Sequence, residues 1–189
     1  MRSVELETEL VDVALGQLES LDYRGMNITD EDLTFLTRTP RLERLILSKT
    51  QITNSGLRHL AGLTRLTSLY LEQTEITDDG LRIIVELPQL RWIHLSDTPV
   101  TDVGVAHLFK LDQLFGLDLN GTKITDEGLR TISTFPQLGM LRAKRTKVTD
   151  AGLSHLAGMQ KLMSLDVGQT LVTDEGIRRL KCSLKKLIT

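Results

Sequence analysis

Aromatic residues are scarce in this chain of 189 residues: one Trp, two Tyr and four Phe make up 4%, against 40% hydrophobic residues in total. A core of ordinary size must therefore be filled by aliphatic side chains, chiefly Leu. Long apolar runs are also missing, because acidic residues interrupt the first seventeen positions and no later segment approaches the length of a membrane span. With 25% charged residues, the composition predicts a soluble, folded, cytoplasmic protein.

Cysteine and an excess of one charge are lacking as well. The single Cys182 excludes an intramolecular disulfide and a metal site built from several cysteines. The formal net charge is −2, whereas proteins that bind nucleic acids usually carry a clear basic excess. We therefore expect no nucleic-acid or membrane partner, no metal and no cofactor.

A tripeptide of an aliphatic residue, Thr, and Asp or Asn recurs every 24 residues. A Gly stands four residues after the aliphatic in every copy except the first, which has Asp32. Prolines recur every 48 residues, so two consecutive repeats form a larger period. We divide the chain into an N-terminal helical cap (1–17), the repeats (18–174) and a C-terminal cap (175–189). The seven copies begin at Ile28, Ile52, Ile76, Val100, Ile124, Val148 and Val172.

Each repeat also contains a run of Leu residues such as Leu66-x-x-Leu69-x-Leu71. Its alternation predicts a short strand. Apolar residues spaced three to four apart behind the Thr-Asp pair predict a short helix, and we interpret the recurring Asp residues as helix caps. The pattern resembles the leucine-rich repeat, LxxLxLxxN/CxL. The resemblance implies an α/β fold: a right-handed solenoid with about seven parallel strands on its concave face and short helices on its convex face.

The turn Thr-Asp-x-Gly-Leu is similar to the cysteine-containing repeats of F-box substrate adaptors and to short cytosolic repeats of bacterial proteins. Thr occupies the usual Asn or Cys position in six repeats and Met26 does in the first, so we expect buried Thr hydroxyls that bond to backbone groups in the turn. An F-box adaptor needs a helical domain ahead of its repeats, but only 17 residues precede Leu18. We therefore expect that this chain alone is not a complete adaptor.

The strand positions between the Leu residues are predicted to form a concave array open to solvent. Tyr70 and Trp92 fall there although the repeat requires no aromatic residue, and aromatic and Arg side chains are enriched at binding hot spots. Arg142, Lys144 and Arg145 form a basic corner nearby. The candidate partner-binding residues are Arg44, Ile46, Tyr70, Glu72, Trp92, His94, Asp118, Asn120, Met140, Arg142 and Lys144.

No catalytic motif stands outside the repeat pattern, so we predict a non-enzymatic module that binds a protein or peptide ligand on its concave face. We expect a monomer. Two alternatives remain open: the substrate-recognition part of a ubiquitin-ligase complex, and a regulator that covers the active site of an enzyme in the manner of ribonuclease-inhibitor-type repeats. Fold analogy alone does not rank them.

Overall fold

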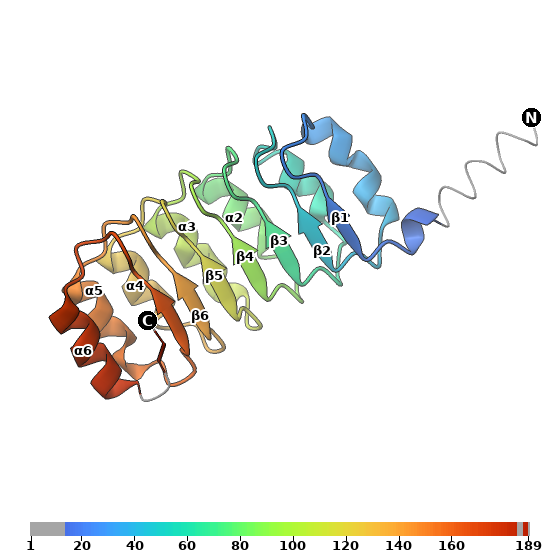
Figure 1. The fold of residues 1–189 in the computed structure, drawn as a ribbon. Helices are drawn as coiled ribbons and strands as arrows, with labels where there is room; N and C mark the ends of the chain where they lie inside the picture. The colour runs from blue at the N-terminus through green and yellow to red at the C-terminus, as the bar shows by residue number, and fades with distance from the viewer. Residues whose placement is uncertain (1–13, 185–186, 189) are drawn as a thin grey trace, which may run out of the picture.

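The computed structural model describes residues 14–184 and 187–188, which form a single solenoid (Figure 1). Seven strands of three residues each lie in one parallel sheet in chain order. The register advances by one repeat at every step, so that Leu45 pairs with Leu69. The predicted α/β solenoid with seven parallel strands is confirmed. The strands are β1 (Ser20–Asp22), β2 (Arg44–Ile46), β3 (Ser68–Tyr70), β4 (Trp92–His94), β5 (Gly116–Asp118), β6 (Met140–Arg142) and β7 (Ser164–Asp166).

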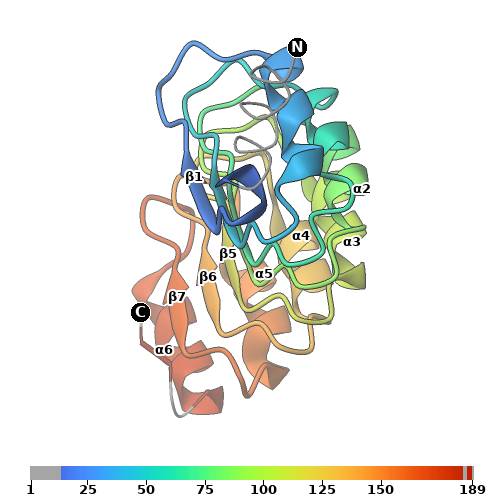
Figure 2. The same cartoon turned by 90° about the vertical axis from the view of Figure 1, so that its right-hand side faces the viewer.

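Short helices form a second layer behind the sheet, as the edge-on view shows (Figure 2). The first two repeats carry 3-10 helices, and the later repeats carry α-helices, two of which end in a short 3-10 turn. The helices are η1 (Asp30–Arg38), η2 (Gly56–Leu60), α2 (Asp78–Ile84), α3 (Asp102–His107), η3 (Leu108–Lys110), α4 (Asp126–Ile132), α5 (Asp150–His155), η4 (Leu156–Gly158) and α6 (Asp174–Ser183).

The core between the two layers is aliphatic. Leu69 and Leu71 of one repeat and Leu81 of the helix behind them are fully buried, and equivalent residues recur along the chain. Among the described residues, Phe135 is the one aromatic side chain in the buried core. Each repeat therefore adds a narrow layer of Leu, Ile and Val, which explains why few aromatic residues are needed.

A ladder of buried threonines follows the strands. The hydroxyl of Thr74 donates to the carbonyl of Leu71 at 2.7 Å, and the hydroxyl of Thr98 donates to Leu95 at 2.7 Å. The same bond recurs in the later turns. The predicted bonding of these hydroxyls to the turn backbone is confirmed. It satisfies a buried polar group within each layer.

The Asp residue that starts η1, α2, α3, α4 or α5 bonds to the next repeat rather than capping its own helix. Oδ1 of Asp102 accepts from the N–H of Thr125 at 2.8 Å, and Oδ2 accepts from the Thr125 hydroxyl at 2.7 Å. The helix cap comes from Thr125 itself, whose hydroxyl accepts from the N–H of Glu127. The interpretation of these Asp residues as helix caps is therefore wrong. The same bridge joins Asp30 to Thr53, Asp78 to Thr101, Asp126 to Thr149 and Asp150 to Thr173.

This Asp–Thr bridge also explains the recurring Gly. A Cβ on Gly128 would lie 2.4 Å from Oδ1 of Asp102, closer than real atoms approach. The first repeat, which stacks on no earlier repeat among the described residues, has Asp32 instead of Gly. The carboxylate of Asp32 accepts from the N–H of Thr29 at 2.8 Å, which replaces from within the repeat the bond that a preceding Asp would supply.

Most of the predicted N-terminal cap (1–17) lies outside the described residues. Of the predicted N-terminal helical cap, residues 14–16 are helical, and the rest of the prediction falls outside the described residues except for a turn at residue 17. No described helix is long and apolar enough to cross a membrane.

Candidate functional site

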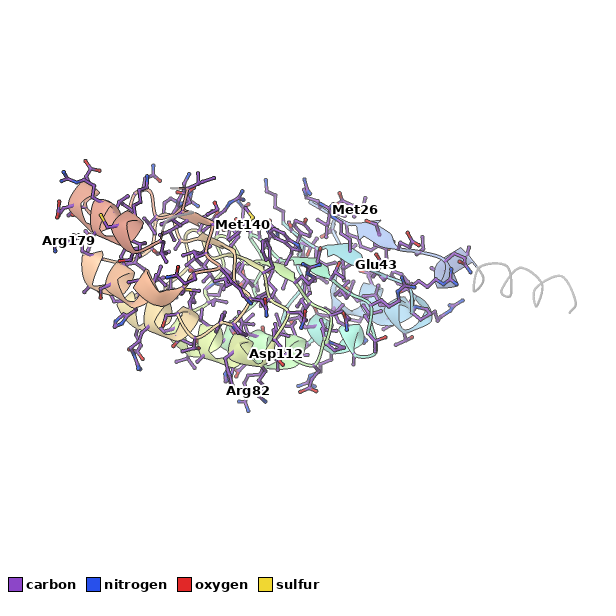
Figure 3. All side chains as sticks on the ribbon, turned by 90° about the horizontal axis from the view of Figure 1, so that it is seen from below. Met26, Glu43, Arg82, Asp112, Met140 and Arg179 are labelled. Atoms are coloured by element: carbon purple, nitrogen blue, oxygen red, sulfur yellow. The ribbon has the colours of Figure 1, made fainter. Side chains whose placement is uncertain are left out.

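The candidate residues gather on the concave face, defined as the outward-facing positions of β2–β6 and the turns that follow them. Figure 3 shows Met140 on the sheet side of the solenoid and Arg82 on the opposite, helical side. All eleven predicted residues belong to this face. Two are not open to solvent as expected: Ile46 is 4% exposed, and Asp118 is 7% exposed. Ile46 is enclosed because larger neighbours such as Tyr70, its partner in the strand register, share the same side of the sheet.

A stack of three side chains crosses β2, β3 and β4. The rings of Tyr70 and His94 lie parallel, with their centroids 4.2 Å apart and an angle of 10° between their planes. The guanidinium of Arg44 lies over the Tyr70 ring, 4.8 Å from the ring centroid. Offset stacking and cation–π attraction both favour this order. The strand register produces it by placing Tyr70 beside His94.

His94 lies between two carboxylates. Its Nδ1 is 3.6 Å from Glu72 and 4.0 Å from Asp118, while Glu72 also accepts from the Ser48 hydroxyl. Burial lowers the pKa of His94 below its ordinary 6.5, and the two carboxylates oppose that shift only in part. The ring is therefore neutral at neutral pH.

The carboxylate of Asp118 is bound on several sides. It accepts from the Ser96 hydroxyl at 2.6 Å and from the N–H of Asn120 at 3.0 Å, and it lies 3.5 Å from the guanidinium of Arg142. Asn120 in turn accepts from the N–H of Lys144 at 2.7 Å. Asp118 and the carbonyl oxygen of the Asn120 side chain thus join neighbouring strands in the middle of the concave face.

Trp92 covers a glycine on the next strand. A Cβ on Gly116 would lie 2.1 Å from the Trp92 ring, and the ring also meets Phe115 edge-on at a centroid distance of 5.3 Å. Sequence reasoning did not place Gly116 in the site; its signal was the lack of a side chain at a strand position. Beside this contact is a shallow hollow of about 50 Å³, lined by Trp92, His94, Gly116, Leu117, Asp118, Met140 and Arg142.

Each cation of the predicted basic corner is paired with a carboxylate. Lys144 Nζ is 2.9 Å from Asp166, and the guanidinium of Arg145 is 2.6 Å from Asp97, two repeats earlier. Each cation is nevertheless more exposed than its partner, most clearly Arg142 at 52% against Asp118 at 9%. The carboxylates therefore hold the cations in place and leave their outer sides open. Asp97 and Asp166 were missed because these contacts join different repeats.

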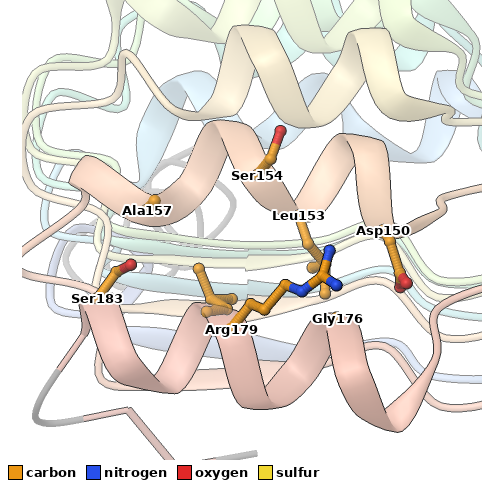
Figure 4. A pocket seen from close by; sticks show the side chains of 8 residues that line it. Asp150, Leu153, Ser154, Ala157, Gly176, Arg179 and Ser183 are labelled. Atoms are coloured by element: carbon orange, nitrogen blue, oxygen red, sulfur yellow. The ribbon is translucent and has the colours of Figure 1, made fainter.

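A hollow between two helices lies on the other face. It has a volume of about 250 Å³ and lies between α5 and α6, and the residues that line it include the small Ala157 on α5 and Gly176 on α6 (Figure 4). The carboxylate of Asp150 at its edge is already bonded to Thr173, and Arg179 pairs with Glu175 at 2.9 Å. Within residues 14–184 and 187–188, no group of three or more His, Cys, Asp or Glu residues is placed to hold a metal ion. The charged side chains that line this hollow are thus already paired, and the described residues there do not indicate a catalytic or metal-binding site.

Comparison with known proteins supports the fold. A family model described as a leucine-rich repeat matches residues 117–133, from β5 through α4. The solved structure of an internalin from Listeria monocytogenes is similar to the chain with a TM-score of 0.65 and 21% sequence identity. The match covers 93% of this chain and 61% of the internalin chain, and at this identity it shows the fold alone. No curated protein matches the sequence.

Proposed function

We propose that this leucine-rich-repeat solenoid is a non-catalytic protein–protein interaction module that binds a protein or peptide on its concave face. The observation that carries the proposal is the cluster of Tyr70, Trp92 and His94 on neighbouring strands. Stacking of repeats requires the same contacts in every layer, so a side chain found in one layer alone is not required for stacking. Half-buried aromatic rings next to Arg side chains are typical of binding hot spots.

The shape and charge of the face favour one kind of partner. The hollow between Trp92 and Met140 has room for part of one apolar side chain. Arg142 and Lys144 lie beyond it with 52% and 43% of their side chains exposed, held by less exposed carboxylates. A partner that carries an apolar side chain followed by acidic residues would fill the hollow and pair with the two cations. Side chains that are already held in place lose less entropy when a partner binds.

A random peptide library displayed on phage and selected against the immobilised chain tests this proposal. We expect the enriched peptides to combine an apolar residue with a nearby Asp or Glu. Because truncation of a hot-spot residue commonly costs 2 kcal/mol or more, Trp92→Ala should weaken the selected peptides by about tenfold or more. Arg142→Ala should weaken them less and reduce the dependence of binding on salt.

Arg82→Ala is the matched control for the charge substitution. Arg82 lies on α2, on the opposite side of the molecule, and its side chain is 66% exposed (Figure 3). We expect Arg82→Ala to leave peptide binding unchanged. Equal binding to wild type, Trp92→Ala and Arg142→Ala would exclude the concave face as the binding site. That the protein is monomeric, cytoplasmic and without nucleic-acid or membrane partners stays a prediction.

A further inference from the structure

One interior junction keeps the geometry of the Asp–Thr bridge but not its charge. At the junction between η2 and α2, Asn54 stands where the other junctions have Asp. The carboxamide oxygen of Asn54 accepts from the N–H of Thr77 at 3.0 Å, and its nitrogen donates to the Thr77 hydroxyl at 2.7 Å. Because a backbone N–H can only donate, it fixes which end of the carboxamide faces it. The repeats are therefore joined here without a negative charge.

The side chains around Asn54 have donors that no group in the protein uses. A carboxamide nitrogen carries two hydrogens, and Asn54 uses one of them on Thr77. Within residues 14–184 and 187–188, the hydroxyl of Ser55 and the guanidinium of Arg58 make no hydrogen bond or ion pair. Both side chains belong to exposed residues. These donors are therefore available to a ligand from solution.

The unused donors line one hollow on the helical side of the solenoid. It has a volume of about 380 Å³ and lies between η2 and α2. Arg82 of α2, which Figure 3 labels on this side, adds a second guanidinium. One carboxylate opposes the two cations: Asp79 lies 4.0 Å from Arg82 and its side chain is 81% exposed. The hollow thus keeps an excess of positive charge. Its lining residues are Asn54, Ser55, Arg58, Asp79, Arg82 and Ile83.

The hollow between α5 and α6 lies at the same position of the repeat, four repeats further on, and lacks this excess. Asp150 takes the place of Asn54 there, and Ser154 takes the place of Arg58. Arg179, which also lines it, is paired with a carboxylate at 2.9 Å. Stacking of the repeats therefore does not require the unused donors or the positive charge between η2 and α2.

A phosphate group matches the donors of this hollow. It carries a charge of about −1.5 to −2 and three strong acceptor oxygens, and guanidinium groups bind phosphate through parallel N–H groups. A carboxylate has one charge and two oxygens, so it would use fewer of the donors. Ile83 lines the same hollow and is half-buried, which offers an apolar contact to the carbon atoms that carry the phosphate. These features together favour a phosphate ester over the free ion.

We propose that the hollow between η2 and α2 is a binding site for a phosphate monoester. Arg58 and Arg82 bind the phosphate oxygens from the two helices, and Asn54 and Ser55 donate to them from the turn before η2. Ile83 contacts the carbon side of the ester. The hollow lies on the helical side of the molecule, so this site goes beyond the function proposed for the concave face and does not depend on it.

A short peptide with one phosphoserine between uncharged residues is the probe. It is titrated into the full-length chain labelled with ¹⁵N, and the side-chain signals of Asn54, Arg58 and Arg82 are followed. We expect all three to shift, with a Kd of about 1 mM or tighter. Because each guanidinium supplies charge-assisted hydrogen bonds, Arg58→Ala and Arg82→Ala should each weaken binding about fivefold or more. Inorganic phosphate, titrated in parallel, should bind several times more weakly than the phosphopeptide.

Asn54→Asp separates binding from folding. It gives this junction the carboxylate that the other junctions have, so the bridge to Thr77 and the stability against urea should be preserved. The added negative charge should weaken phosphopeptide binding about tenfold or more. Arg178→Ala is the matched control, because Arg178 occupies on α6 the position that Arg82 occupies on α2, and it should leave binding unchanged.

Four outcomes would overturn the proposal. The first is that the phosphopeptide, raised to about 10 mM, shifts none of the three side-chain signals. The second is equal binding by wild type and either Asn54→Asp or Arg58→Ala. The third is equal binding of the same peptide without its phosphate, which would assign the hollow to the peptide chain. The fourth is equal binding of inorganic phosphate, which would assign the hollow to the free ion.

Discussion

The Asp–Thr–Gly junction on the helical side and the concave face are built from the same seven repeats, but the junction repeats and the face does not. At the junction, Asp78, Asp102, Asp126 and Asp150 each bind the next Thr through the same two bonds, with lengths of 2.6–2.8 Å. On the concave face, each strand carries different side chains. The difference separates positions that serve stacking from positions free to serve a partner.

The first and last repeats sharpen this comparison, because among the described residues each stacks on a repeat on one side only. Asp32 stands in the first repeat where the later repeats have Gly, and it supplies in its own repeat the bond to Thr29. Asp174 keeps the pattern but has no following Thr among the described residues. One interior junction also differs, because Asn54 takes the place of Asp and bonds to both the N–H and the hydroxyl of Thr77.

The largest effect is expected at the junction glycine. A Cβ on Gly152 would lie 2.3 Å from Oδ1 and 3.0 Å from Cα of Asp126, so side-chain movement alone does not relieve the clash. Despite the better helix propensity of Ala, Gly152→Ala should lower the free energy of unfolding by about 2 kcal/mol, measured by urea denaturation. Gly158→Ala is the control, because nothing lies within 4 Å of its Cβ. Equal stability of the two variants would contradict the junction model.

The next largest effect on stability is expected from removing a carboxylate that bridges two repeats. Asp102→Ala removes both bonds to Thr125 and leaves the partly buried Thr125 N–H without its partner. We expect a loss of about 1.5 kcal/mol in the free energy of unfolding. Asp174→Ala changes the equivalent Asp, whose side chain has no hydrogen-bond partner among the described residues, and should change stability by less than about 0.5 kcal/mol. If both substitutions cost the same, the Asp residues act within their own helices and not between repeats.

A smaller effect is expected from the ion pair that spans two repeats. Arg145 reaches past Gly121 to Asp97 at 2.6 Å, but both side chains are well exposed, at 50% and 38%. Arg145→Ala should therefore cost about 0.5 kcal/mol or less in thermal or urea unfolding at moderate salt. A loss comparable to that of Asp102→Ala would show that concave ion pairs support the fold as strongly as the junction does.

The smallest effect on stability is expected from replacing His94, and this effect depends on pH. Because burial lowers its pKa in the folded state, the unfolded chain takes up a proton that the folded ring resists. The stability contributed by the neutral ring is complete above pH 6.5 and is lost as pH falls through 6.5 and then through the lower folded pKa. Thermal unfolding of wild type and His94→Gln should therefore diverge on the acid side, with wild type losing more. A constant difference between the two across this range would contradict the lowered pKa.

Much of the fold was predictable because it follows from periodicity. The spacing of Leu66, Leu69 and Leu71 predicts the strand and its buried side, and the helix positions follow from the spacing behind each Thr-Asp pair. Even the bond from the Thr74 hydroxyl was predictable, since its acceptor lies three residues away. Contacts of this kind are local in the chain, so one repeat contains all the information.

The candidate site was predicted in outline and not in detail. The alternation along β3 and β4 correctly places Tyr70 and Trp92 on the sheet's outer side. It does not show that Trp92 fills the space left by Gly116, or that His94 stacks on Tyr70 between two carboxylates. These contacts depend on the conformations of side chains on neighbouring strands. The sequence repeat does not predict them, because its spacing is the same whichever conformations the side chains adopt.

The sequence alone thus determined the repeat length, the aliphatic core and the side of each strand on which the unusual residues lie, and these follow from spacing along one chain segment. The parallel sheet was implied by the resemblance to the leucine-rich repeat. Only the tertiary structure decided that Asp102 serves the next repeat and not its own helix, and that Arg145 pairs with Asp97 across an intervening repeat. Both contacts join residues more than twenty positions apart in the sequence. Local sequence patterns do not reveal such contacts, because only the stacking of the repeats brings these residues together.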